Sequence, residues 1–198
     1  MADYLAIAAV GKSLERLLTA CFEEEQPIEN KKTKAVLVQT GDFDKNMVSQ
    51  SIKPPALSIY LYRVDFNKAM RAAWSGVGSL TNKGILALDL HFLMTPWAEN
   101  AEFEHRILGK AMQCLEARPI WSGPLLHNSS AWAPQEGVQI AMEEISTEAL
   151  MRTFDSLPTD YRLSVAYVAR VVRIETKPLQ QPKPVMTVAT GITVSSRP

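Results

Sequence analysis

The chain has 198 residues, 46% of them hydrophobic, and its 21 basic and 21 acidic side chains give a formal net charge of zero. This length suits one domain with a sizeable core. A nucleic-acid binder normally carries a basic excess, and no apolar run here approaches the roughly 20 residues of a membrane-spanning helix. We therefore expect a cytosolic, soluble protein without nucleic-acid or membrane partners.

The N-terminal segment is predicted to be a helix, and the next segments alternate between polar connections and strands. Asp3 precedes apolar residues at helical spacing, which predict an amphipathic helix to about Phe22. A charged loop leads to a short predicted strand, Ala35–Thr40. The stretch Gly41–Pro55 is polar, and the alternating residues of Ala56–Asn67 predict a strong strand.

The middle of the chain predicts a strand followed by a helix. A connection over Lys68–Lys83 leads to a predicted strand, Ile85–Met94. Asn100 or Thr95 then begins a helix that ends before Pro119. The segment from Pro119 to Pro134 is expected to be an irregular loop.

The last third predicts two strands that flank a short helix. The strands are Gly137–Ile145 and Tyr161–Thr176, and the helix Glu148–Phe154 is capped by Ser146. Because the second strand is largely apolar on both faces, it suits the centre of a sheet. The order of elements is not a strict βαβ alternation, so we predict an α+β fold with a mixed, mainly antiparallel sheet flanked by helices.

The C-terminal tail differs from the rest of the chain. We expect one domain over residues 1–176, then a proline-containing linker and a β-prone tail over residues 177–198. The uncharged segment Val185–Val194 would be an aggregation hazard if unpaired. Two alternatives remain: it folds back onto its own sheet, or it adds to a sheet edge of a neighbouring chain.

The two cysteines, Cys21 and Cys114, lie in helical, apolar patterns and form no C-x-x-C pair. Two such residues do not make a disulfide framework. We expect both to be small buried hydrophobic side chains.

A cluster of acids and histidines suggests chemistry, but its spacing does not support it. An E-x-x-H sequence ends at His105, and di-metal sites of helix bundles require a second such motif, which is missing. Asp89 and His91 share one side of a predicted strand, opposite a leucine-rich core face, so we expect them on an exposed or subunit-facing side. We expect no catalytic residue, metal or cofactor. The alternative is a small metal-dependent enzyme that uses Asp89, His91, Glu104 and His105.

Glu104 falls inside the apolar half of its predicted helix. A buried carboxylate needs a partner. We therefore expect a structural buried charge that pairs with an arginine or with loop backbone N–H groups.

Mixed charges at the end of the Ala56–Asn67 strand have two interpretations: a solvated loop, or a docking surface. Arginine and tryptophan are over-represented as interface anchors. The candidate interface residues are Arg63, Asp65, Asn67, Arg71, Trp74, Trp121, Trp132, Val185, Val188, Ile192 and Val194.

Three segments together resemble a known family. They are LSIYLYRVDFNKAMR, LALDLHFLMTPWAENAEFEHRILGKAMQCLEARP and EISTEALMRTFDSLPTDYRLSVAYVARVVRIE. In this order they resemble the N-terminal domain of the tail-tube terminator, or cap, protein of extracellular contractile injection systems. These are phage-tail-like particles of the antifeeding-prophage type. The resemblance covers roughly residues 3–176.

The resemblance implies a structural function. Such a cap forms a hexameric ring at the tube end away from the baseplate, stops tube polymerisation and joins the last sheath ring to the tube. The implied partners are copies of the chain itself, the inner tube protein and the sheath protein, in a particle that is assembled in the cytoplasm. A neck or baseplate adaptor of the same particle is the alternative. Some family members carry a larger C-terminal extension than the segment that follows the core here.

Overall fold

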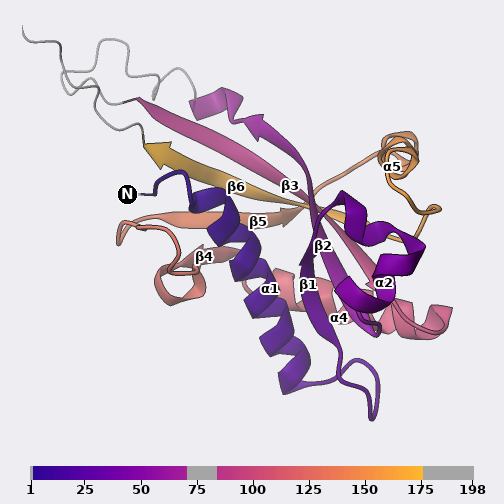
Figure 1. The fold of residues 1–198 in the computed structure, drawn as a ribbon. Coiled ribbons are helices and arrows are strands. Elements are labelled where there is room, and N and C mark those ends of the chain that lie inside the picture. Colours follow the sequence, from indigo (N-terminus) through magenta and orange to yellow (C-terminus); the bar gives the residue numbers. More distant parts are fainter. Residues whose placement is uncertain (1, 71–83, 176–198) are drawn as a thin grey trace, which may run out of the picture.

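The computed structural model describes residues 2–70 and 84–175, and the strands in these residues form one six-stranded sheet (Figure 1). The sheet order is β1-β2-β3-β6-β5-β4. The strands are β1 (Lys34–Val38), β2 (Ala56–Phe66), β3 (Ile85–Trp97), β4 (Ile120–Ser122), β5 (Gly137–Met142) and β6 (Val165–Glu175). β1 is parallel to β2, and the other neighbouring pairs are antiparallel. The predicted mixed, mainly antiparallel α+β fold is confirmed, and β6 lies inside the sheet.

Short polar side chains accept backbone N–H groups at the starts of most of the described α-helices, but not at the start of the first one, where Leu5 is the N-cap. They are α1 (Ala6–Glu24), α2 (Lys45–Ser51), α4 (Ala101–Ala117) and α5 (Thr147–Asp155), with 3₁₀ turns η1 (Thr40–Phe43) and η2 (Gly123–Leu125). Asn100 accepts the N–H of Phe103 at the start of α4, and Ser146 caps α5. Of the two predicted starts of α4, Asn100 is therefore the correct one, and β3 extends through Thr95 to Trp97.

Two segments for which no helix or strand was predicted contain regular structure. The polar stretch before β2 holds η1 and α2, whose first turn is capped by Asp44. The stretch after α4 holds β4 and η2. Both predictions were incomplete because a helix of two turns or a strand of three residues leaves almost no periodic pattern in the sequence.

Helices cover both faces of the sheet, and each face has its own apolar core. Phe92 and Met94 of β3 belong to the core that includes α1 and α4, whereas Leu93 and Trp97 belong to the core that includes η1 and α5. Successive residues of a strand point to opposite faces. The alternation of apolar side chains along β3 therefore sets both layers.

Helix α1 covers the outer edge of β1 (Figure 1). A carboxylate oxygen of Glu15 accepts the N–H of Leu37 at 3.2 Å. The hydroxyl of Thr19 accepts the N–H of Ala35 at 3.2 Å and donates to the carbonyl of Ala35 at 3.4 Å. An open strand edge is a template for pairing with another chain. Side chains of α1 therefore seal this edge.

Cys21 of α1 and Cys114 of α4 are joined by a disulfide, with their Cα atoms 6.5 Å apart. The prediction of two unpaired buried cysteines is therefore wrong. The residues are 93 positions apart in sequence, so the sequence pattern did not reveal the pairing. The two cysteines meet because α1 and α4 pack on the same face of the sheet.

Several predictions fall outside the described residues. They concern the linker and tail of residues 177–198 and the candidate interface residues Arg71, Trp74, Val185, Val188, Ile192 and Val194. Within the described ranges, no helix combines the length and apolar character needed to cross a membrane.

Candidate interaction surface

The candidate surface starts on the paired strands β2 and β3. A β-bulge between Leu61 and Arg63 shifts the register, so that Arg63 lies opposite His91. A bulge inserts one extra residue and re-aims the side chains that follow it. This bulge places Arg63 beside a histidine of the neighbouring strand.

His91 lies at the centre of a charged network that continues onto the segment after β5. Its Nδ1 is 2.7 Å from Oε2 of Glu143, and its Nε2 is 3.3 Å from Oδ2 of Asp65. Arg63 donates from Nη2 to Glu143 at 2.9 Å and from Nε to Asp65 at 3.0 Å. Buried charges are tolerated when they are paired and hydrogen-bonded, and each of these charges has at least one partner of opposite sign or a hydrogen bond.

The structure corrects the predicted position of His91. It was expected on an exposed or subunit-facing side, but it is only 4% exposed. Glu143 and the ring of Tyr62, whose centroid is 6.1 Å from that of the imidazole, help to bury it. The Tyr62 hydroxyl donates to Glu143 at 3.1 Å.

Glu143 accepts hydrogen bonds from both Tyr62 and Arg63 and contacts His91, so it links all three side chains. Burial, followed by the negative charge of Glu143, raises the pKa of Tyr62 to about 12. Sequence reasoning missed Glu143. The only available signal was a pair of acids, Glu143 and Glu144, near the end of the predicted strand Gly137–Ile145.

The outer rim of the network is accessible. The side chains of Arg63 and Asp65 are 47% and 52% exposed. Beside them, the amide of Asn67 donates to both carboxylate oxygens of Asp89, at 3.1 and 3.2 Å. The charged side chains predicted at the end of this strand are thus held in place by ion pairs and hydrogen bonds with one another.

A second feature lies at the other end of β3. The guanidinium of Arg162 is 4.2 Å from the centroid of the Trp97 ring, and it donates to Glu104 at 3.0 Å. Glu104 therefore has the expected arginine partner, although its side chain is half-buried, with 21% exposed. A groove of about 440 Å³ borders these three residues. Its lining also includes Phe43, Lys45, Val48, Asp160, Tyr161 and Leu163.

The four residues of the alternative enzyme hypothesis do not meet in one site. His91 contacts Glu143, Asp89 binds Asn67, Glu104 binds Arg162, and His105 is exposed. In residues 2–70 and 84–175, no group of three or more histidine, cysteine, aspartate or glutamate side chains is placed to hold a metal ion.

The two tryptophans after α4 differ in accessibility. Trp121 is fully buried and donates its Nε1–H to the carbonyl of Arg118 at 2.8 Å. Its prediction as an interface residue is corrected, because β4 points the indole into the core. Trp132 is half-buried and donates to the carbonyl of His127, so part of it remains available for contacts.

Comparison with known families supplies the identity of the fold. Residues 9–187 match the family described as the Pvc16 N-terminal domain. The chain belongs to the Pvc16 N-terminal domain family. A search of curated proteins finds no match.

Two solved structures share the architecture of this Pvc16 N-terminal domain. One is the sheath/tube terminator of the PVC extracellular contractile injection system in its extended state, with a TM-score of 0.57 and 17% identity. The other is the tube-terminating cap of the anti-feeding prophage, with a TM-score of 0.53 and 18% identity. The matches cover 96% and 92% of this chain. This chain spans only 64% and 60% of the lengths of those two chains.

Proposed function

We propose that this Pvc16 N-terminal domain is a structural cap of a contractile injection particle. It ends tube polymerisation and joins the last tube and sheath rings. The observation that carries the proposal is the family match over residues 9–187, which spans β1 to β6 and α4. Likeness to the PVC terminator and to the anti-feeding prophage cap over 96% and 92% of the chain supports it.

The partners in this proposal are proteins. The chain forms a ring of six copies and contacts the tube and sheath proteins, without cofactor or catalysis. Candidate contact residues are the exposed rim of Arg63 and Asp65, the adjacent Asn67, and Trp132. Arginine at the rim of a preformed network suits docking, because its side chain is already ordered before contact. The chain is made in the cytoplasm and becomes part of the particle.

The C-terminal segment has a proposed role in assembly. An uncharged, β-prone stretch such as Val185–Val194 suits addition to a sheet edge of a neighbouring chain. A chain that ends at Pro184 should fold with an unchanged circular dichroism spectrum and yield fewer complete particles. A wild-type particle yield from this truncation would reject the role of the tail and leave the cap proposal intact.

A neck or baseplate adaptor differs from a cap only in its position on the particle. Electron microscopy with a gold label on a tagged chain separates the two. We expect label at the end of the tube away from the baseplate. Label at the baseplate end contradicts the cap and supports the adaptor.

A further inference from the structure

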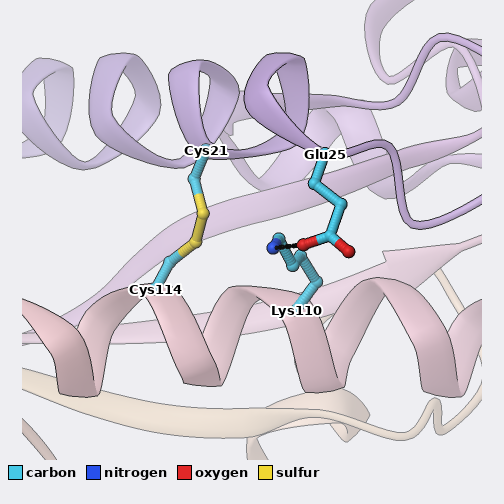
Figure 2. Close-up of a disulfide and its surroundings, with 4 residues drawn as sticks. All are labelled: Cys21, Glu25, Lys110 and Cys114. Atoms are coloured by element: carbon cyan, nitrogen blue, oxygen red, sulfur yellow. Dashed lines mark hydrogen bonds and ion pairs between the residues drawn. A yellow bond between two sulfur atoms is a disulfide. The ribbon is translucent and has the colours of Figure 1, made fainter.

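Two cross-links one helical turn apart join α1 to α4. Cys21 is bonded to Cys114, and Glu25 pairs with Lys110 (Figure 2). From the first pair to the second, the residue on the α1 side is four positions later in the sequence, and the residue on α4 is four positions earlier. Because residues at i and i+4 share one helix face, the two helices run antiparallel along this contact.

We infer that the Cys21–Cys114 bond is a redox-dependent staple that fastens the end of α1 onto the folded domain, closing after folding rather than being required for it. The inference does not depend on the cap function. It concerns the covalent state of two residues of this chain, which can be measured on the purified protein.

Contacts other than the disulfide hold α1 in place, so the reduced chain should keep its fold. Val10, Leu14 and Leu18 are fully buried in the core that includes α4. Arg16 donates from Nη2 to the carbonyl oxygens of Pro124 and Leu125 at 2.7 and 3.0 Å. These contacts hold the N-terminal and middle turns of α1, whereas Cys21 lies in its last turns.

A small oxidant can reach the cysteine pair. A groove of about 200 Å³ is lined by both residues, together with Leu17, Glu24, Lys110, Gln113, Ala117 and Arg118. Cys21 is half-buried, whereas Cys114 is only 6% exposed. Accessibility therefore makes Cys21 the first thiol to react and Cys114 the resolving thiol.

The closing reaction is thiol–disulfide exchange with a small-molecule disulfide such as oxidised glutathione. The Cys21 thiol loses its proton, its sulfur attacks the small disulfide, and one small thiol leaves with a proton. The Cys114 thiol then loses its proton and its sulfur attacks Cys21, which releases the second small thiol. Two protein thiols are oxidised, and one small disulfide is reduced to two thiols.

The Cys21–Cys114 bond should stabilise the contact between α1 and the outer edge of β1. Cys21 follows Thr19 by two residues, and Thr19 bonds to both the N–H and the carbonyl of Ala35 in β1. When the staple is open, the last turns of α1 are held only by non-covalent contacts. The N–H groups of Ala35 and Leu37 should then become accessible to water more often.

The first test compares the full-length wild-type chain in dithiothreitol with the same chain after incubation with excess oxidised glutathione. Mass spectrometry of non-reduced peptides should find the 21–114 link only after oxidation. Both forms should share one circular dichroism spectrum, and the oxidised form should melt on the order of 10 °C higher. A reduced chain that is unfolded, thiols that stay free in excess oxidant, or equal melting temperatures would each overturn the inference.

The second test uses variants and hydrogen exchange. The double variant Cys21→Ala/Cys114→Ala should melt like the reduced wild type and ignore dithiothreitol. Cys114→Ala should form a mixed disulfide with glutathione faster than Cys21→Ala. In the reduced wild type, amides of the α1 end and of β1 should exchange roughly tenfold faster than in the oxidised form, with α5 unchanged. Equal amide exchange of β1 in the reduced and oxidised forms would contradict the proposed effect of the disulfide on this edge. Faster mixed-disulfide formation by Cys21→Ala than by Cys114→Ala would contradict the proposed order of reaction.

Discussion

The Nδ1 atom of His91 lies 2.7 Å from Oε2 of Glu143, although the two residues are 52 positions apart in sequence. This contact ties β3 to the segment after β5, across β6. The sheet therefore has a polar cross-link above its apolar core, and Arg63 and Asp65 complete it on the outside.

Replacing His91 with alanine should destabilise the domain by about 1–3 kcal/mol, because it removes a buried partner of Glu143 and leaves a gap under Tyr62. Urea unfolding of the purified chain measures this change. His105→Ala is the matched control, since His105 is exposed and should shift stability by no more than about 0.5 kcal/mol. Equal effects of the two variants would refute the structural role of His91.

The strands that carry this network were predictable, but the network was not. The spacing of side chains at every second residue predicted β2 and β3, because successive side chains of a strand point to opposite faces. The burial of His91 depends on a β-bulge in β2 and on a glutamate from the segment after β5. Neither feature leaves a local pattern, so His91 and Asp89 were expected on an exposed face.

Helix caps were also predictable from the sequence, whereas contacts between residues far apart in the sequence were not. Asn100 and Ser146 were recognised as caps because capping is a contact within one helical turn. The bond between Cys21 and Cys114 depends on how α1 and α4 lie on the sheet, and Trp121 turns inward only because β4 joins the edge of β5. The arginine partner of Glu104 could be expected from the cost of burying a carboxylate, but its identity as Arg162 could not.

Tyr62 makes stability fall at alkaline pH. Its pKa in the fold is raised to about 12 by burial and by the charge of Glu143, against about 10 in an unfolded chain. The unfolded chain therefore loses this proton first, so the contribution is complete below pH 10 and is lost as the pH rises from 10 to 12. Tyr62→Phe should lose less stability than wild type between pH 9 and pH 11. Parallel unfolding curves at both pH values for the two chains would contradict this.

Tyr167 differs from Tyr62 in the hydrogen bonding of its hydroxyl group. Its hydroxyl is buried and has no hydrogen-bond partner among the described residues. Removing an unsatisfied buried hydroxyl costs little and can stabilise. We expect Tyr167→Phe to leave the free energy of unfolding at pH 7 unchanged or higher, whereas Tyr62→Phe should lower it by about 1 kcal/mol. A clear loss of stability in Tyr167→Phe would show that the hydroxyl has a partner.

Arg162 connects the segment before β6 to Trp97 and Glu104. Replacing it with alanine should cost about 1 kcal/mol, since the ion pair is partly exposed and the stacked guanidinium adds a cation–π contact. Thermal unfolding measures the effect, with Arg152→Ala as control because its pair with Glu148 is exposed on α5. Equal melting temperatures of the two variants would show that the contacts of Arg162 with Trp97 and Glu104 do not stabilise the fold.

The central claim, that the chain ends the tube, is tested most directly by the distribution of tube lengths. The gene is deleted, and purified particles are imaged by electron microscopy with and without the wild-type chain supplied in trans. A cap predicts tubes of broad and greater length in the deletion strain, sheaths detached from the tube end, and uniform particles after complementation. Tubes of normal, uniform length without the chain would contradict the account.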